Sequence, residues 1–198
     1  MINRATIVVI CTLLATSSAL ALQAAPAVKT TPAVPIVPAV AAAPTQPAPD
    51  GLLDQDDVLE DAAEITAAKY PDAESVLVGE YVRTEYQADG SYVTFDDEYV
   101  KVLTEEGRQG AREKQFSYNA FYGGMKIIAV EVIKPNGQIA SFDPATISKE
   151  QVDRSQMSSN IYDPNHKIVV AAAKNVEIGD TVRFFVQRWA SKPRMKDN

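Results

Sequence analysis

The stretch SVLVGEYVRTEYQADGSYVTFDDEYVKVL, residues 75–103, decides the fold class of this chain. Its two halves, 75–86 and 91–103, alternate apolar and polar residues and are rich in β-branched and aromatic side chains, which is typical of half-buried strands. The dipeptide Asp89-Gly90 lies between them, and glycine tolerates the positive φ of a tight turn. We therefore predict an antiparallel hairpin over these residues.

The length of the loop predicts the register of this hairpin. With two residues in the loop, Tyr86 lies opposite Val93 and Arg83 lies opposite Asp96. Because successive residues of a strand point to opposite faces, the register decides which side chains share a face of the sheet.

The rest of the chain has the same character. Further strand patterns occupy residues 112–119, 125–134, 138–142, 166–173 and 181–190. Turn signals at Pro135–Gly137 and Gly179-Asp180 separate some of them, and Asp143–Pro164 reads as a long surface crossing with a short turn of helix. Several strands joined by turns predict a mainly β domain, an antiparallel β-sandwich or curved sheet.

One helix precedes the strands. Asp54 is a natural N-cap, and Asp56 and Asp57 fall in the first turn, where the helix dipole favours negative charge. The apolar residues of the segment recur at spacings of three and four. Pro71 disfavours helix at the residue before it. We predict a helix from Gln55 to Lys69. Its acidic residues lack the spacing of a calcium-binding loop, so no metal site is expected there.

The N-terminal quarter predicts export. Residues 1–21 combine a positive start, a short apolar run and the small-x-small pattern Ala19-Leu20-Ala21, which indicates a signal peptide cleaved before Leu22. The apolar run is shorter than the ~20 residues that span a bilayer. Residues 22–51 hold a segment rich in alanine and proline, with seven of the twelve prolines in 24–49. We predict a disordered, extended linker there, and a periplasmic or secreted location.

The predicted domain, residues 52–198, is long enough to bury one core. Residues 50–198 carry 17 basic and 26 acidic side chains, and seven of the acids lie in 50–64. The remainder is nearly balanced and shows no basic patch, so nucleic acid is not an expected partner.

Cysteine and histidine are scarce, which limits the possible chemistry. Cys11 lies inside the predicted signal peptide, so the mature chain would have no disulfide, thiolate nucleophile or thiolate metal site. The single histidine, His166, lies in the turn-like YDPNHK, and no nucleophile-elbow motif is present. We expect no catalytic residue, no metal and no cofactor.

The segment TEEGR, Thr104 to Arg108, raises a specific alternative. Two adjacent carboxylates with a glycine and an arginine could form an acid/base pair with an anion clamp. Adjacent residues of a strand point to opposite faces, however, whereas a glycosidase pair is held across its substrate. We predict a strand-to-strand turn closed by Gly107, with Arg108 as a surface cation beside Glu105 and Glu106.

A family resemblance covers Ala67 to Met195. It depends on an ordered set of segments: YPDAESVLV, the Asp-Gly hairpin, YVKVLTEEGR, FSYN, EVIKPNGQI and VEIGDTVRFFV. In this order they resemble the bacterial domain of unknown function found N-terminal to transglutaminase-like domains in exported proteins. The resemblance implies a β-sandwich companion to a cysteine-dependent module. That chemistry cannot be carried over to any residue here.

Two functions from different classes follow. The first is a non-catalytic exported module that binds or positions a protein or cell-envelope partner for a transglutaminase-like domain, in cis or in trans. The second is a glycan-binding protein or hydrolase that uses carboxylates. Its residues would be Glu80, Asp96, Asp97 and Glu98, with Tyr81 and Tyr99. Three of these carboxylates converging in one pocket with raised pKa values would favour the second function.

The C-terminal strand pattern supplies a candidate docking surface. The sequence after it, RWASKPRMKDN, has no clear closing strand, so we expect a domain truncated at Asn198. Residues 181–190 would then form an exposed sheet edge, which invites a partner strand. Phe185 and Trp189 would lie on one face of this edge as apolar anchors.

Overall fold

The computed structural model describes residues 48–159 and 162–191. All of these residues belong to one compact unit. The predicted signal peptide and residues 22–47 of the predicted linker therefore lie outside the described residues. None of the helices in the described ranges has the length and apolar character needed to span a bilayer.

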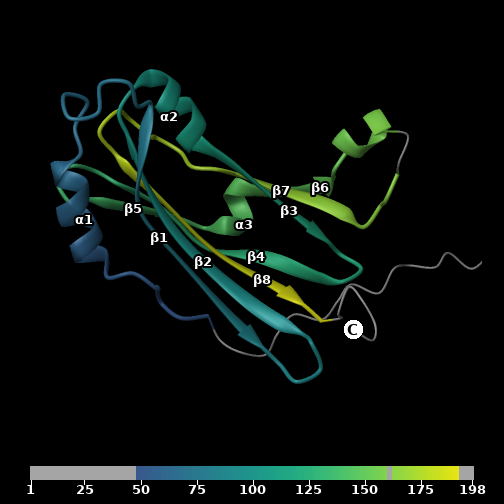
Figure 1. Ribbon diagram of the computed structural model, residues 1–198. Coiled ribbons are helices and arrows are strands. Elements are labelled where there is room, and N and C mark those ends of the chain that lie inside the picture. Colours follow the sequence, from purple (N-terminus) through teal and green to yellow (C-terminus); the bar gives the residue numbers. More distant parts are fainter. Residues whose placement is uncertain (1–47, 160–161, 192–198) are drawn as a thin grey trace, which may run out of the picture. The chain divides into compact units, whose positions relative to one another are not determined.

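The described residues form two antiparallel sheets, as predicted for a mainly β domain (Figure 1). The large sheet has the strand order β1-β2-β8-β4-β5. Its strands are β1 (Ser75–Tyr86), β2 (Tyr92–Val102), β8 (Thr181–Ala190), β4 (Gly123–Ile133) and β5 (Ile139–Phe142). The small sheet has the order β3-β7-β6. Its strands are β3 (Glu113–Asn119), β7 (His166–Ala172) and β6 (Ser148–Val152).

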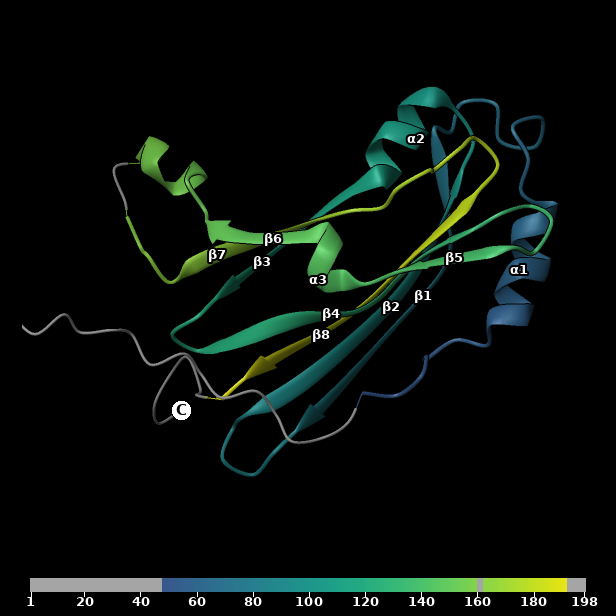
Figure 2. The ribbon, with the colours of Figure 1, turned by 180° about the vertical axis from the view of Figure 1, so that it is seen from behind.

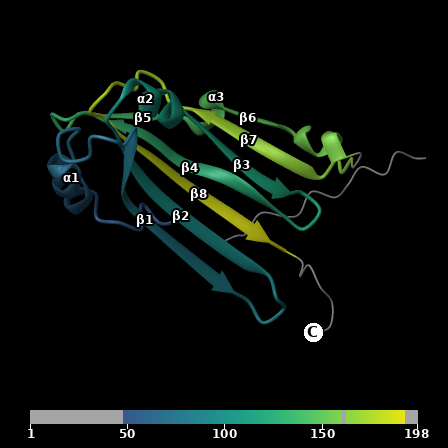
Figure 3. The same ribbon diagram turned by 45° about the horizontal axis from the view of Figure 1, so that its top comes forward.

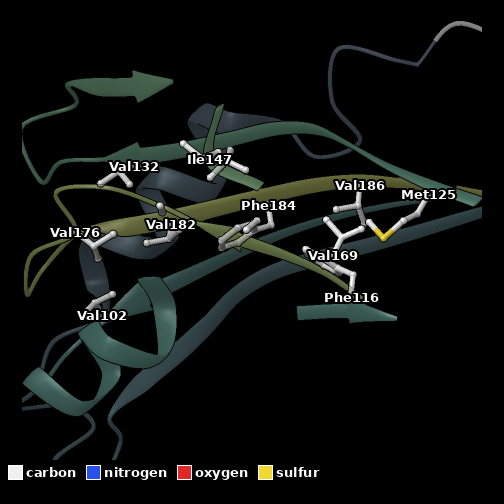
Figure 4. Close-up of a cluster of buried hydrophobic side chains, with 13 residues drawn as sticks. Val102, Phe116, Met125, Val132, Ile147, Val169, Val176, Val182, Phe184 and Val186 are labelled. Carbon is white, nitrogen blue, oxygen red and sulfur yellow. The ribbon is translucent and has the colours of Figure 1, made fainter. Parts of the chain in front are cut away.

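The two sheets pack face to face over the main hydrophobic core, and Figure 3 shows the small sheet lying along one face of the large one. The face of the large sheet toward the small sheet is called the inner face here. Figure 4 shows Val186 of β8 and Met125 of β4 close to Phe116 of β3 and Val169 of β7. Because this core draws on strands from the whole chain, it joins the two sheets into one domain.

The opposite, outer face of the large sheet is covered by the N-terminal part of the domain (Figure 2). Helix α1 (Gln55–Glu64) buries Val58 and Ala62 there. Residues 48–54, called the strap, precede α1, and Ala48 and Leu52 of the strap pack against the buried Phe95 and Phe185. Residues 48–51, which the sequence assigned to the linker, thus lie against the sheet.

Helix α1 starts as predicted and ends earlier. The Asp54 side chain accepts a hydrogen bond from the Asp56 N–H at 3.0 Å, which confirms the N-cap. The helix ends at Glu64, one turn before the predicted Lys69, and Ile65 is its extended C-cap. The remaining residues up to Pro71 form turns, because no further apolar face is available to hold them as a helix.

The first hairpin forms, but its predicted register is wrong. Tyr86 pairs with Tyr92 and Arg83 pairs with Phe95, one residue away from the expected partners. The loop is longer than two residues, since the Gln87 N–H donates to the Ser91 carbonyl. Gly90 has the expected positive φ of 81°. The Asp-Gly signal therefore located the turn without fixing its length.

The prediction of a turn at TEEGR is also wrong. These residues start a two-turn helix, α2 (Glu105–Arg112). The Thr104 hydroxyl caps it by accepting from the Gly107 N–H at 3.1 Å, and the first turn contains Glu105 and Glu106. A β-carbon on Gly107 would lie 1.9 Å from the Glu74 carbonyl oxygen, so glycine is needed here for close packing rather than for a turn.

The irregular segment contains more structure than predicted. The expected short turn of helix is α3 (Pro144–Ile147), and a 3₁₀ turn, η1, covers Ser155–Ser159. Between them lies β6, which the sequence did not indicate. Its residues SKEQV are mostly exposed, because β6 is an edge strand that pairs only with β7 among the described strands. A strand with so few buried side chains shows little of the apolar alternation that identifies a strand in the sequence.

The expected docking edge at residues 181–190 is not an edge. β8 lies between β2 and β4, and almost all of its residues are buried. Phe185 has no exposed surface, and Trp189 packs in the same cluster beneath the strap. The two side chains do share one face, as expected. They anchor the interior of this domain, because β8 has a neighbouring strand on each side and most of its residues are buried.

Candidate functional site: a carboxylate cluster on the inner face

Strand β2 sends three successive acids to two different environments. Asp96, Asp97 and Glu98 alternate along the strand, so the first and third point to the inner face and Asp97 to the outer face. The pairing with β8 confirms this, because Asp96 and Glu98 lie opposite the core residues Val186 and Phe184. One stretch of sequence therefore supplies acids to two charged clusters, one on each face of the large sheet.

The carboxylate cluster consists of Glu80, Asp96 and Glu98. One carboxylate oxygen from each lies within 4.8 Å of the others. Glu80 of β1 stands directly opposite Glu98 of β2. Two side chains are partly buried, with 14% of Asp96 and 18% of Glu98 exposed. Like charges this close repel each other, so the cluster requires cations or a ligand to balance it.

Two cations approach the cluster. Lys114 of β3 reaches across from the small sheet and bonds the Glu98 carboxylate. Arg188 of β8 lies 3.6 Å from Asp96, measured from Nη2 to Oδ2. Burial lowers the pKa of Lys114 below its ordinary value, and Arg188 lowers it further, while Asp96 and Glu80 act in the opposite direction. The cluster therefore holds three carboxylates against two cations.

A small cavity adjoins the cluster. It has a volume of about 220 Å³ and extends below α2 between the sheets. Glu98 and Lys114 form its polar side, and Val100, Ala111 and Phe184 are among its apolar walls. A charged group next to an apolar wall is the usual arrangement of a specific binding site.

The exposed side of β1 continues this face. Leu77, Val82 and Tyr86 lie on it, with exposed fractions of 53%, 53% and 74%. Their partners on β2 have the same parity as Asp96 and Glu98, which places them on the inner face. β1 pairs with β2 alone among the described strands, so it is the edge of the large sheet. Acidic and apolar side chains thus occur together along a free edge.

The geometry determines which chemistry the cluster can support. Three oxygen ligands could hold a hard cation such as Ca²⁺, an ammonium or guanidinium group, or the hydroxyls of a sugar. Glycoside hydrolysis needs two carboxyl groups on opposite sides of a bond. Here all three come from adjacent strands of one sheet face and stand side by side. The arrangement therefore suits binding better than acid/base catalysis.

Asp97, the fourth predicted carboxylate, is committed to structure. It is fully buried on the outer face and accepts two hydrogen bonds from Arg183, both of 2.8 Å. Glu131 accepts from the Arg183 Nη1 at 3.1 Å, and the Leu52 N–H of the strap donates to Asp97 at 2.9 Å. This set, Arg183, Asp97 and Glu131, is called the arginine network.

The arginine network is electrostatically satisfied. Burial would lower the pKa of Arg183, but the hydrogen bonds and charge of Asp97 raise it above its ordinary value. The guanidinium also lies over the rings of Tyr99 and Phe185, at 5.2 and 5.4 Å. Because both oxygens of Asp97 are used within the protein, the carboxylate is not available to a ligand.

The two tyrosines of the carboxylate hypothesis do not join the cluster. Tyr99 is fully buried on the outer face, and burial raises the pKa of its phenol. Tyr81 is half exposed and also belongs to the outer face, opposite Asp97. The structure thus brings together three of the four predicted carboxylates and neither tyrosine. The criterion for the second function asked for three carboxylates in one pocket, and of these three only Glu98 lines the adjoining cavity.

The acids of TEEGR do not form a paired site. Arg108 bonds Glu105 within helix α2, with 2.7 Å from Nε to Oε2, which confirms its role as a surface cation. This hydrogen bond lowers the pKa of Glu105. Both charged groups of this pair are largely solvated.

His166 is also on the surface. Its Nε2 lies 3.7 Å from Asp153, and it lines an open cavity with Ser117. No hydrogen bond joins His166 to Ser117 in the described ranges, and 42% of the histidine side chain is exposed.

The sequence did not indicate the cations of either cluster. Lys114, Arg183 and Arg188 come from strands that pair or pack with β2 only in the fold, and the most distant pair, Arg188 and Asp96, is 92 residues apart along the chain (188 − 96). Their positions in alternating strands resemble those of solvated lysines and arginines. Only the strand order shows that they face the acids of β2.

Known families and structures were compared with this chain. The model of a domain of unknown function with a solved structure, DUF3857, matches residues 88–198, more than half of the chain. This match confirms the resemblance to a domain of unknown function. No curated protein matches the chain.

One solved structure supports the fold. A chain described as a "putative protease" from Parabacteroides distasonis ATCC 8503 aligns with a TM-score of 0.54 and 18% identity. The alignment covers 61% of this chain and 24% of that one. A family 3a carbohydrate-binding module from the Clostridium thermocellum scaffoldin aligns over 57% of this chain and 68% of its own, at 12% identity. Its TM-score of 0.31 is too low to indicate a shared fold.

Proposed function

The chain belongs to the DUF3857 family, and from that premise we propose that it is a non-catalytic recognition module of an exported bacterial protein. It binds or positions a partner for a transglutaminase-like domain, in cis or in trans. The segments quoted for the family resemblance support this assignment, and the signal-peptide pattern of residues 1–21 supports export. In the Parabacteroides protein the matching fold is about a quarter of a longer chain, which fits an accessory role.

The observation that carries the proposal is the edge strand β1. It is twelve residues long, and among the described strands it pairs only with β2, so one of its two edges has no neighbouring strand. An edge of this kind offers backbone N–H and C=O groups to an added strand. Leu77, Val82 and Tyr86 would contact alternate side chains of that strand. The recognition surface is therefore β1, rather than β8.

The negative charge of the carboxylate cluster indicates which side chains a partner strand would carry. The carboxylate cluster lies on the same face as the exposed apolar residues of β1, and it has one more negative than positive group. An extended segment with lysine or arginine at alternate positions would pair with β1 and place a cation beside Glu80. Exposed ion pairs of this type weaken as salt is added.

The test measures association in trans. A transglutaminase-like domain from the same organism is titrated into the full chain by isothermal calorimetry. The double variant Val82→Lys/Tyr86→Lys should weaken binding at least about tenfold, because it removes apolar contacts and adds like charge. The matched control Glu105→Ala/Glu106→Ala, on exposed residues of α2, should change binding less than about twofold. Absence of association, or equal affinity for all three proteins, contradicts the proposal.

A second candidate function follows from the carboxylate cluster itself. Three carboxylate oxygens within 4.8 Å could bind the hydroxyls of a glycan, either alone or through a cation. Peptidoglycan fragments are the appropriate probe for an envelope protein. Binding or turnover that is lost in Glu80→Gln and in Asp96→Asn, and kept in Val82→Lys/Tyr86→Lys, would favour this function over the first.

A further inference from the structure

A second cavity lies at the opposite, outer face of the large sheet, and none of its lining residues belongs to β1. Its volume of about 460 Å³ falls within the range of small-molecule sites. The C-terminal half of α1 and the residues after it form one side. The end of β2, the β4–β5 turn and the loop before β8 form the other. No part of the proposed recognition surface contributes to it.

The walls of this cavity are mainly apolar. Leu59, Ala62 and Ile65 line it from the α1 side, and Leu103, Pro135 and Ile178 line it from the sheet side. Ile178 is 55% exposed, so it stands at the rim. An apolar ligand could therefore enter and remove these side chains from water, which is favourable by roughly 25 cal/mol per Å².

Lys101 of β2 also lines the cavity and has no direct partner. Only 9% of the residue is exposed. Within residues 48–159 and 162–191, no hydrogen bond or ion pair to its ammonium is formed. The charge of Asp180 acts on the Lys101 ammonium, but this carboxylate already bonds Lys134 at 2.8 Å and the Glu177 N–H at 2.7 Å. Lys134, the other lysine of the cavity, is thereby neutralised.

The side chain of Lys101 is mostly buried, so its ammonium, which faces the cavity, loses part of its hydration. Burial lowers the pKa of Lys101, and Asp180 only partly offsets this. A methionine of similar length would fill the same space without the cost of desolvating a charge. The lysine is therefore poorly explained by stability alone, whereas an anionic ligand would supply the missing partner.

We propose that this cavity binds a carboxylate with an apolar body, whose anionic end pairs with the Lys101 ammonium while the body lies against α1. The charge of Lys101 selects the anion, and the leucine and isoleucine walls select the aliphatic part. Two sources share this chemistry: a short fatty acid, and the C-terminal carboxylate of an apolar peptide.

The experiment compares probes that differ only at the anionic end. Octanoate and octanol, and an Ala-Leu-Leu peptide with a free or an amidated C-terminus, are titrated into the full chain by calorimetry. We expect either octanoate or the peptide with a free C-terminus to bind. Its neutral analogue, octanol or the amidated peptide, should bind at least tenfold more weakly. Which acid binds identifies the source. Equal binding of an acid and its neutral analogue, or no binding of either acid, overturns the proposal.

Substitutions of cavity residues test whether the acid binds in this cavity. Lys101→Met should reduce affinity for the bound acid at least tenfold and should resist urea better than the unsubstituted protein. The exposed Lys126→Met is the matched control and should bind normally. Because Ile178 stands at the rim, Ile178→Asp should weaken binding by repulsion, whereas Ile178→Asn should not. Unchanged affinity in both Lys101→Met and Ile178→Asp contradicts the assignment and leaves the β1 function unaffected.

Discussion

The two faces of β2 carry similar groups and differ in what covers them. On the outer face, Asp97 and Arg183 lie beneath the strap and use their hydrogen-bonding capacity on each other, on Glu131 and on the strap backbone. On the inner face, Asp96 and Glu98 lie beyond the edge of the core and keep an excess of negative charge. The cover, rather than the residue type, decides whether a carboxylate stabilises the fold or faces a ligand.

The largest effect is expected from breaking the arginine network. Arg183→Met leaves Asp97 buried without its cation, which typically costs about 3–5 kcal/mol in the free energy of unfolding. Arg188→Met removes the partly exposed partner of Asp96 on the other face and should cost less than about 1 kcal/mol. Urea denaturation measures both. Equal losses in the free energy of unfolding would show that the cover over the outer face does not make its ion pair more important than the one on the inner face.

A smaller effect is expected from disturbing the strap. A β-carbon on Gly51 would lie 2.9 Å from the Arg183 Nη2, which Asp97 holds in place. Gly51→Ala should therefore reduce the free energy of unfolding by about 1–3 kcal/mol. Gly110→Ala is the matched control, since nothing lies within 4 Å of its β-carbon and helix α2 should gain roughly 0.5–1 kcal/mol. An unchanged melting temperature for Gly51→Ala would show that the strap backbone moves to make room for the added methyl group.

Alkaline pH tests the cover over Tyr99. Its pKa is raised by burial above the ordinary value of 10.0. The unfolded chain therefore loses its phenol proton first, and stability falls as pH rises above 10. Tyr99→Phe should retain about 1 kcal/mol more stability at pH 11 relative to pH 8 than the unsubstituted protein. The half-exposed Tyr81→Phe is the control, and an equal gain there would mean that burial of Tyr99 is not the cause.

The smallest effect is expected at the carboxylate cluster. Glu80→Gln removes one of two like charges that stand opposite each other, so it should stabilise the fold by roughly 0.2–1 kcal/mol, most at low salt. Glu85→Gln, on the same strand beside Arg83, should not stabilise it. Urea titrations at low and high ionic strength measure the difference. Stabilisation that persists at 1 M salt would exclude charge repulsion as its cause.

The sequence alone determined the local features of this protein. The alternation of residues 75–103, the Asp-Gly turn and the Asp54 cap predicted the first hairpin and the start of α1, because each depends on groups a few residues apart. For TEEGR the local signal was ambiguous. Thr104 and two acids favour a helix start, while Gly107 suggested a turn, and packing against Glu74 decided the outcome.

Only the tertiary structure decided which strands are neighbours. A period of two places residues on one face or the other, but it does not say what lies next to the strand or above it. The position of β8 between β2 and β4 made Phe185 and Trp189 core residues and brought Arg183 to Asp97. The same order left β1 at the edge, whereas the alternation along β2 by itself separated Asp97 from Asp96 and Glu98. These contacts join residues far apart in the chain, so no local pattern contains them.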